Sequence, residues 1–333
     1  MAFTPHFDAA AIPDLTGKVA IVTGANVGIG FETAYFLASR NATVYVAARN
    51  EQRALAAIDR LHERLKAEKI DARLLYHHLD LASVESARRS AEDFLAKEDR
   101  LDILICNAGV MGARWTPEIP YEPMFLTNHI GHFVFVTTVL PLIEKTALQT
   151  HDARIVITTS ESMALHKTID YEAVSQRPAD ADVPRGIRDW PKSMSAYGRS
   201  KLANVWFAKE LDVRVRDKGI WVNAAHPGLV GATELGQEFN DFVNPWISKI
   251  AQVIVAWLFM SPKDGAATQT YLATSPDVPA HNVHGRYYYA RMGWLMGFKG
   301  PVDYKLDPAY ENEDEWRRLW DWTEDVVQKE LAK

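Results

Sequence analysis

Short apolar, β-branched runs alternate with longer amphipathic segments along most of this chain, and no other feature constrains the fold as strongly. The runs that predict strands lie at residues 19–23, 43–48, 74–79, 103–106, 154–158 and 221–225. Helical spacing of apolar residues predicts helices at about 28–40, 51–68, 84–97, 125–144 and 195–215. Buried strands that alternate with helices indicate a parallel sheet covered on both faces. The expected fold class is therefore α/β, with a doubly wound parallel sheet.

A single domain over residues 1–333 is expected, because the alternation continues past residue 120 without a linker, repeat or low-complexity tract. Two segments interrupt the alternation. An insertion at about 166–192 is polar and rich in Asp, Arg and Pro, and a segment at about 234–260 combines helical spacing with large aromatic side chains. Both follow the carboxyl ends of predicted strands, where open α/β sheets bind their ligands.

Charge and cysteine content argue against several classes of protein. A formal net charge of -6 argues against a nucleic-acid-binding protein, which would present a basic face. The one cysteine, Cys106, excludes an internal disulfide, and no group of His, Asp and Glu has metal-ligand spacing. The N-terminus has no basic region followed by an apolar core, and the apolar stretch at residues 250–260 is too short to span a bilayer. We therefore expect a cytoplasmic protein with no metal, no nucleic-acid partner and no transmembrane segment.

A glycine-rich turn follows the first predicted strand. The sequence TGANVGIG, residues 23–30, places glycines at positions 24, 28 and 30 and leads into a predicted helix. Glycines permit a tight turn, and a backbone without side chains lets a pyrophosphate approach the helix N-terminus. The turn predicts a dinucleotide site on a Rossmann-type sheet. An ordinary strand-to-helix turn is the alternative interpretation.

The residues after the second predicted strand bear on the choice of dinucleotide. Arg49 and Asn50 follow that strand, and Arg53 lies one helical turn further on. An acidic residue at this place would bind the adenosine ribose, whereas an arginine would neutralise a 2′-phosphate. The pattern favours NADP(H). The alternatives are that Glu51 binds a ribose and that Arg49 only caps a solvated loop.

Tyr197 and Lys201 form the candidate catalytic pair. Their i, i+4 spacing places them on one face of a predicted helix. A phenol has a pKa near 10, and an adjacent ammonium favours the phenolate and so lowers that pKa. The pair would then be a usable general acid and base. A Tyr-x-x-x-Lys match is common by chance, so it needs support from other motifs.

That support comes from a series of motifs in one order. They are TGANVGIG at 23–30, ARN at 48–50, DL at 80–81, CNAG at 106–109, NHIGHF at 128–133, RIVITTS at 154–160, YGRSKLAN at 197–204 and HPGLV at 226–230. In these motifs the chain resembles the short-chain dehydrogenases/reductases, and especially their retinol-dehydrogenase-like branch, over roughly residues 15–289. The resemblance implies an oxidoreductase that uses a nicotinamide dinucleotide.

The resemblance also assigns roles to four catalytic residues. Tyr197 would exchange a proton with the substrate oxygen, and Ser160 would hydrogen-bond that oxygen. Lys201 would hold the nicotinamide ribose and tune Tyr197. Asn128 would bend its helix and hold a water that links Lys201 to solvent. The buried-looking His129, His132 and His226 would have packing roles.

A larger set would bind the cofactor. It comprises the glycine turn, the end of the second strand, the adenine-facing pair, the turn after the fourth strand and the turn after the sixth. Its members are Gly24, Asn26, Val27, Gly28, Ile29, Gly30, Arg49, Asn50, Asp80, Leu81, Asn107, Ala108, Gly109, Tyr197, Lys201, Pro227, Gly228, Val230 and Thr233. We further expect a mobile substrate lid at about 234–260 and a homodimer through the helices that carry Asn128 and Tyr197.

The chain departs from the family pattern at four places. Cys106 stands where the family often has a second Asn, and the gap between Ser160 and Tyr197 is longer than usual. The threonine usual after the Pro-Gly turn is displaced by one residue, to Thr233. The N-terminal membrane-anchoring helix of many retinol dehydrogenases is absent from this sequence, so we do not transfer their localisation.

Reduction of a carbonyl is the function that the resemblance favours. The substrate would be a ketone or aldehyde on a lipophilic or polycyclic small molecule, reduced by NADPH and reversibly formed by alcohol dehydrogenation. Reduction of a carbon–carbon double bond or an aromatic precursor on the same scaffold is an alternative, because it would use the same Tyr197 and Lys201. A non-catalytic NADP sensor is the alternative from another class, and it would be expected to lack the Tyr or the Lys.

Overall fold

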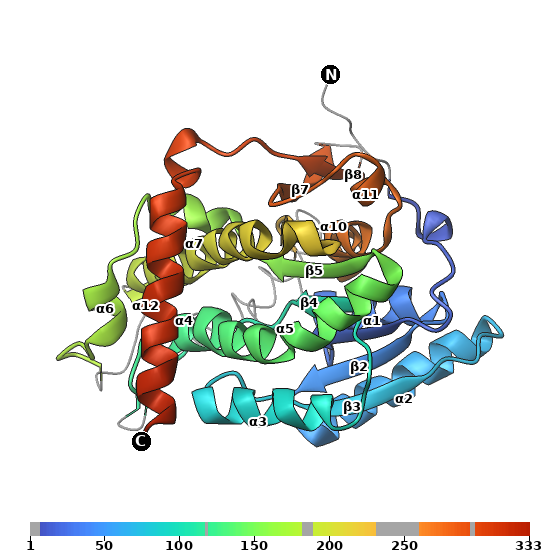
Figure 1. Ribbon diagram of the computed structural model, residues 1–333, viewed down its shortest axis with the longest axis horizontal. Helices are drawn as coiled ribbons and strands as arrows, with labels where there is room; N and C mark the ends of the chain where they lie inside the picture. The colour runs from blue at the N-terminus through green and yellow to red at the C-terminus, as the bar shows by residue number, and fades with distance from the viewer. Residues whose placement is uncertain (1–6, 117–118, 182–188, 231–259, 294–296) are drawn as a thin grey trace, which may run out of the picture.

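An eight-stranded sheet forms the centre of the protein in this computed structural model, which describes residues 7–116, 119–181, 189–230, 260–293 and 297–333. The strand order is β3-β2-β1-β4-β5-β6-β7-β8 (Figure 1). The strands are β1 (Val19–Thr23), β2 (Thr43–Ala48), β3 (Leu74–His78), β4 (Ile103–Cys106), β5 (Ala153–Thr158), β6 (Ile220–His226), β7 (Tyr287–Gly293) and β8 (Gly297–Asp303). Neighbours pair in parallel, except that β7 and β8 are antiparallel. The α/β, Rossmann-type fold class is confirmed.

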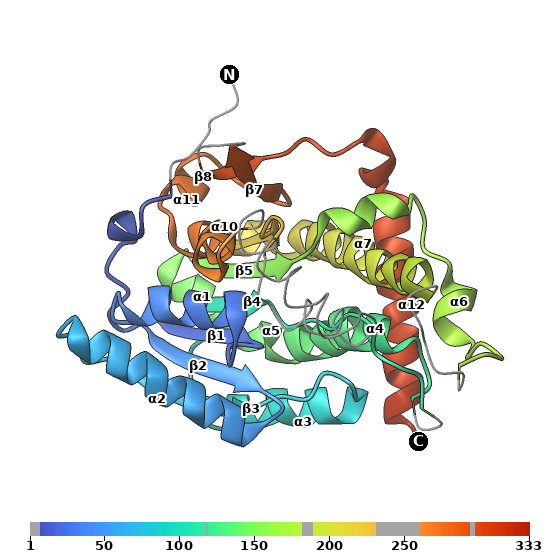
Figure 2. The ribbon, with the colours of Figure 1, turned by 180° about the vertical axis from the view of Figure 1, so that it is seen from behind.

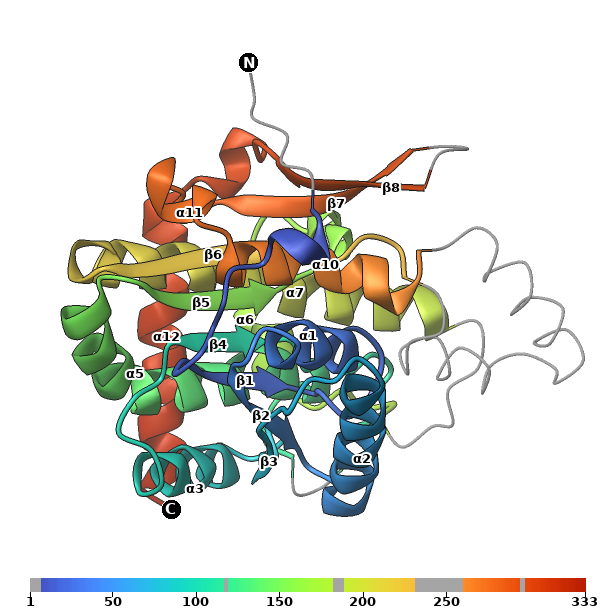
Figure 3. The same cartoon turned by 90° about the vertical axis from the view of Figure 1, so that its right-hand side faces the viewer.

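Helices cover both faces of this sheet. One face carries α1 (Gly28–Ala38) and α2 (Glu51–Ala67), which are in front in Figure 2, and α10 (Pro262–Thr274) packs against α1. The other face carries α3 (Val84–Leu95), α5 (Gly131–Thr150) and α7 (Trp190–Val215). The layers are seen from the side in Figure 3. Two apolar cores, one on each face, follow from this arrangement.

Most predicted strands and helices begin and end within two residues of the observed ones. All six predicted strands are confirmed within two residues at each end. The predicted helix at 125–144 is instead α4 (Pro123–Phe125), a π-helical turn (Leu126–Ile130) and α5, and α7 begins at Trp190 rather than at residue 195. Beyond residue 260 the sequence analysis assigns no element, whereas the structure has α10, α11 (Asp277–Ala280), β7, β8 and α12 (Glu313–Leu331).

The C-terminal helix α12 crosses the outer side of α7 and α3 (Figure 1). The Trp320 ring lies 4.8 Å from that of Phe133 on α5 and 5.9 Å from that of Phe207 on α7, centroid to centroid. Buried His129 meets the Thr323 hydroxyl, with 2.9 Å between Nε2 and Oγ1. This is the side of α5 and α7 through which we expected a homodimer. The homodimer stays a prediction, and a partner approaching this side would meet α12.

One continuous stretch, Pro123–Thr150, is long and apolar enough to cross a membrane by length and composition. It comprises α4, the π-helical turn and α5. Of its most apolar window, 72% is buried inside the fold, as is usual for the core helix of a globular protein.

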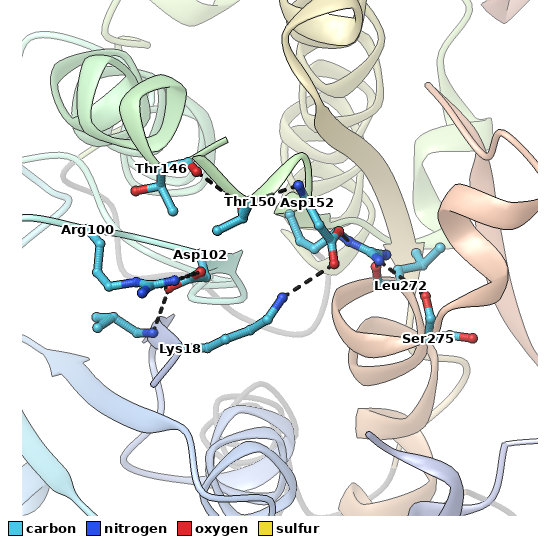
Figure 4. A network of polar contacts seen from close by, with 10 residues as sticks. Lys18, Arg100, Asp102, Thr146, Thr150, Asp152, Leu272 and Ser275 are labelled. Atoms are coloured by element: carbon cyan, nitrogen blue, oxygen red, sulfur yellow. Dashed lines mark hydrogen bonds and ion pairs between the residues drawn. The ribbon is translucent and has the colours of Figure 1, made fainter. Parts of the chain in front are cut away.

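Buried charges are paired at the edge where the strands begin (Figure 4). The Arg100 guanidinium binds both oxygens of buried Asp102, at 2.9 and 2.6 Å, and Asp102 also accepts the Val19 N–H. Arg154, which is 2% exposed, contacts the Asp152 carboxylate, and Lys18 lies 3.3 Å from the same group. These pairs tie the starts of β1, β4 and β5 together.

Parts of three predictions fall on residues that the structure does not describe. They are Thr233, residues 234–259 of the expected lid and residues 182–188 of the expected insertion. The described part of the insertion contains a short helix, α6 (Tyr171–Ser175). The lid, the insertion as a whole and the single domain therefore stay predictions.

Candidate active site

A cavity of about 480 Å³ opens at the carboxyl ends of the first four strands. The chain winds outward from β1 through β2 and β3 in one direction and through β4, β5 and β6 in the other, which opens a crevice at such a reversal. The predicted residues that line the cavity are Gly24, Asn26, Val27, Gly28, Ile29, Gly30, Arg49, Asn50, Asp80, Leu81, Asn107, Ala108 and Gly109. The structure thus brings together thirteen residues that the sequence places in four separate motifs.

The glycine turn is closed tightly against the loop after β4. A Cβ at Gly30 would lie 2.4 Å from the Gly24 carbonyl oxygen and 2.6 Å from Nδ2 of Asn107, so no larger residue fits without movement of the backbone. The Asn107 amide donates to the Thr23 carbonyl at 2.8 Å, and the Ala108 N–H donates to the Thr23 hydroxyl at 2.8 Å. These bonds fix the floor of the cavity beneath the start of α1.

Arginines surround the end of β2. Arg49 and Arg53 are exposed and line the cavity. The Asn50 side chain accepts the Arg53 N–H at 2.9 Å and so caps α2, a structural role that the sequence analysis did not assign. Arg60, also unpredicted, donates to the Asn26 carbonyl at 3.2 Å and lies over the Phe31 ring. This end of the cavity is therefore cationic.

Asp80 and Leu81 form the wall at the end of β3. The Asp80 carboxylate accepts the Ala82 N–H at 3.0 Å, which shapes the turn into α3. Leu81 is buried in the core. Cys106, one of the departures from the family pattern, is buried at the end of β4, where burial raises the pKa of its thiol.

Tyr197 and Lys201 lie together on α7, both buried. Lys201 Nζ lies 5.5 Å from the centroid of the Tyr197 ring and donates to the Thr158 carbonyl at 3.2 Å. Burial lowers the pKa of Lys201 to about 8. Burial also raises the pKa of Tyr197, and a hydrogen bond with Ser160 acts in the opposite direction. The expected lowering of the Tyr197 pKa by Lys201 is therefore not what the structure shows, because burial is the largest influence and raises that pKa.

Ser160 reaches Tyr197 because the chain after β5 packs unusually close to α7. Its hydroxyl caps the short 3₁₀ helix Glu161–Leu165 by accepting the Ser162 N–H at 3.3 Å. A Cβ at Gly198 would lie 2.4 Å from the Ser162 carbonyl oxygen, so the glycine after Tyr197 permits this approach. Ser160 and Tyr197 thus come from two elements and meet in one place.

Asn128 lies within the π-helical turn Leu126–Ile130 and is fully buried. Its amide donates to the Val110 carbonyl and the Ser200 hydroxyl, both at 3.0 Å, and its Oδ1 accepts the Val110 N–H at 2.8 Å. Asn128 Oδ1 and Lys201 Nζ both face Gly109, at 3.3 and 3.2 Å from the position that a Cβ would take there. Asn128 therefore connects the loop after β4 to the catalytic helix.

The three histidines near the site are neutral at pH 7. Burial lowers the pKa of His129 to about 3 and the pKa values of His132 and His226 to about 4. His132 bridges the Asn128 carbonyl and the Thr23 hydroxyl, with 3.0 Å on each side. Among the described residues, no group of three or more His, Cys, Asp or Glu could hold a metal ion.

The turn after β6 does not line the cavity. Val230 forms a parallel bridge with Met260, so the chain on both sides of residues 231–259 meets there. Gly228 has a left-handed backbone with φ of 82°. Pro227, Gly228 and Val230 are thus close to the end of β6 but outside the cavity walls that the described residues form.

An apolar cluster beside Tyr197 was missed by the sequence analysis. Met111 and Met124 are buried against Tyr197 and come from the connection between β4 and α5. The half-buried residues packed on this cluster are Val110, Ala113, Trp190, Met194 and Ala196. The methionines belong to no periodic pattern, and only the geometry identifies them as neighbours of Tyr197.

The similarity of the chain to known proteins agrees with this geometry. A family model for short chain dehydrogenase matches residues 18–173. A short-chain dehydrogenase/reductase of Armillaria gallica is 38% identical over 96% of this chain and 93% of its own, and retinol dehydrogenase 14 of Mus musculus is 34% identical over 93% and 86%. A short-chain dehydrogenase from Shigella flexneri, solved as a complex with NADP, has a similar fold, with a TM-score of 0.59 at 20% identity over 83% of this chain and 98% of its own. The chain belongs to the short-chain dehydrogenase/reductase family, in its retinol-dehydrogenase-like branch, and is an oxidoreductase of that family.

Proposed function

We propose that this oxidoreductase uses NADP(H) to reduce a ketone or aldehyde on a lipophilic small molecule, reversibly as alcohol dehydrogenation, with Tyr197 as the general acid and base. The observation that carries the proposal is the meeting of Tyr197, Ser160 and Lys201, whose Nζ faces Gly109 in the wall of the cavity. Each of the three side chains has the chemistry that this reaction needs.

The residues present fit a dinucleotide with an extra phosphate. The space that a Cβ at Gly30 would occupy is already taken by backbone and Asn107, so the turn presents bare backbone to the start of α1, which suits a pyrophosphate. Exposed Arg49 and Arg53 would bind a 2′-phosphate, and Asp80 and Leu81 would face the adenine. Bound NADPH would supply the hydride.

Side chains of the protein would transfer the proton to and from the substrate oxygen. Burial keeps the Tyr197 hydroxyl protonated at neutral pH, so it is ready to donate its proton to the substrate oxygen. Ser160 would hydrogen-bond that same oxygen as negative charge develops on it. Lys201, with a pKa of about 8, carries its charge near neutral pH and can change it under mildly alkaline conditions.

The apolar cluster around Tyr197 supports the proposed substrate class. Met111, Met124 and the half-buried Trp190 and Met194 pack around Tyr197 with apolar, adaptable side chains. Thioether side chains fill irregular gaps, and apolar walls with a few polar groups are typical of small-molecule sites. A bulky, poorly water-soluble carbonyl compound fits this apolar cluster better than a small charged metabolite does.

The decisive experiment is a titration followed by a substrate screen. Fluorescence titration of wild type should give at least tenfold tighter binding of NADPH than of NADH, since a charge-assisted phosphate contact contributes roughly 1.5–3 kcal/mol. Arg49→Asp should narrow or reverse this ratio. Equal affinities in the wild type would contradict the NADP(H) proposal.

The screen would offer aldehydes, steroids and polyphenolic ketones and follow NADPH oxidation, with product analysis. An alcohol product is expected. A saturated carbon–carbon bond in the product would instead favour the alternative reduction, and tight binding of NADPH without turnover of any substrate would favour a sensor.

A further inference from the structure

Gln269 is a buried amide that joins three elements around the site. It lies on α10 and is 1% exposed. Its Nε2 donates to the Thr33 hydroxyl of α1 at 2.6 Å and to Oδ1 of Asn107 at 3.2 Å. Its Oε1 accepts the Thr158 hydroxyl at 2.8 Å. Both ends of the amide are therefore used, in an interior where an unpaired polar group is costly.

Two of these partners lie in different parts of the proposed site, one at the nucleotide cavity and one beside Lys201. Asn107 lies in the floor of the nucleotide cavity, where its own amide holds the Thr23 carbonyl. Thr158 ends β5, and its carbonyl receives Lys201 Nζ at 3.2 Å and the Asn204 amide at 3.0 Å. Gln269 thus connects the cofactor floor to the carbonyl that positions the lysine.

The neighbouring residue on α10 has a different role. Thr270 is fully buried as well, yet its hydroxyl donates to the Ala266 carbonyl of the same helix at 2.8 Å. A substitution at Thr270 therefore disturbs the packing of α10 without breaking a bond to the site. It provides a matched control for Gln269.

We infer that Gln269 is a positioning residue, which holds Asn107 and Thr158 in a fixed relation so that NADPH binding and the placement of Lys201 depend on one side chain. The inference rests on the proposed NADP(H) function. It predicts that loss of the amide changes cofactor affinity and the pH dependence of turnover together, in a way that loss of packing alone does not.

The test compares Gln269→Leu, Gln269→Glu and the control Thr270→Val in the full-length protein. Gln269→Leu keeps the approximate volume but removes the bonds to Oδ1 of Asn107 and to the Thr158 hydroxyl, while the Thr33 hydroxyl keeps its bond to the Ile29 carbonyl. Its Kd for NADPH should therefore rise at least tenfold. The apparent pKa in its kcat profile should move to lower pH, because a loosened Thr158 carbonyl stabilises the Lys201 ammonium less. Thr270→Val should stay within twofold of wild type in Kd and keep the profile.

Gln269→Glu separates hydrogen bonding from packing. A protonated carboxyl regains one donor, whereas an ionised one repels Oδ1 of Asn107, and burial raises the pKa of a carboxyl. The ratio of its Kd for NADPH to that of the wild type should therefore rise from pH 5 to pH 9, while the ratio for Gln269→Leu stays flat. If Gln269→Leu does not fold, Thr158→Val removes one of the same bonds and is judged by the same two measurements.

The outcomes distinguish the inference from the function on which it rests. A folded Gln269→Leu protein that matches Thr270→Val in Kd and in pH profile, with only its melting temperature lowered, would show that Gln269 serves packing alone and overturn the inference. A wild-type protein that binds neither NADPH nor NADH would overturn the proposed function and the inference with it.

Discussion

The two edges of the sheet bury charge in opposite ways. At the edge where the strands begin, Arg154 is 2% exposed and contacts Asp152, and buried Asp102 is held by Arg100 through two bonds (Figure 4). At the edge where the strands end, Lys201 is 3% exposed and is held by the Thr158 carbonyl. Within the described part of the chain, no carboxylate forms an ion pair with Lys201 Nζ.

The difference separates charged side chains that stabilise the fold, at the structural edge where the strands begin, from a charged side chain proposed to take part in the reaction, at the chemical edge where they end. A buried ion that is paired and hydrogen-bonded is held in one state, whereas a buried ion without a counter-charge has a shifted pKa. Burial lowers the pKa of Lys201 to about 8, which brings its titration close to working pH. Groups with perturbed pKa values are common at functional sites. Burial of the unpaired Lys201 ammonium lowers the stability of the fold.

The first prediction removes a pair from the structural edge, and we expect it to have the largest effect. Asp152→Ala leaves the Arg154 guanidinium buried with the Leu272 and Ser275 carbonyls as its remaining partners. Only Arg154 is buried in this pair, and removing the counter-charge of a buried guanidinium should lower the free energy of unfolding by about 3 kcal/mol. Urea unfolding measures this loss, and NADPH affinity should stay within twofold of wild type. An Asp152→Ala protein as stable as wild type would remove the distinction between the two edges.

The second prediction removes the acid from the chemical edge. Tyr197→Phe should reduce turnover on the order of 100-fold or more, because the substrate oxygen then has no proton donor of matched geometry. Its melting temperature and its Kd for NADPH should stay close to those of wild type, in contrast to Asp152→Ala. Turnover near the wild-type rate would mean that another group donates the proton.

The sheet and the cofactor motifs could be predicted from sequence because their signals are local. A buried parallel strand is a continuous apolar run, so β1, β2 and β4 were predicted with the ends that the structure gives them. The glycine turn requires bare backbone at positions close together in the chain, and Gly28 indeed has a left-handed φ of 60°. Local constraints of this kind are visible without knowledge of the partners.

The remainder could not be predicted because it depends on contacts between distant segments. The surface helix α12 buries one face against the core, where Phe133 and Phe207 contact Trp320. Met111 and Met124 form a cluster with Tyr197 only because α7 packs against them, and Gln269 lies more than 100 residues from each of its three partners. The sign of the Tyr197 pKa shift was also wrong, since spacing reports the neighbour but not the depth of burial.

The third prediction concerns the stability cost of the unpaired lysine, and we expect it to have the smallest effect. The folded pKa of Lys201, about 8, is below its value of 10.5 in an unfolded chain. Below pH 8 both states hold the proton, so Lys201 contributes no pH dependence there. Between about pH 8 and 10.5 the unfolded state binds the proton and the folded state does not, so the stability of wild type should rise with pH.

Lys201→Met lacks this group and should be more stable than wild type at pH 7. Urea unfolding of both proteins without cofactor from pH 7 to pH 10 should show this advantage shrinking by about 2 kcal/mol, as expected for a shift of this size at 1.4 kcal/mol per pKa unit. Parallel curves would mean that Lys201 is hydrated or paired in solution, and the contrast between the two edges of the sheet would then fail at its central residue.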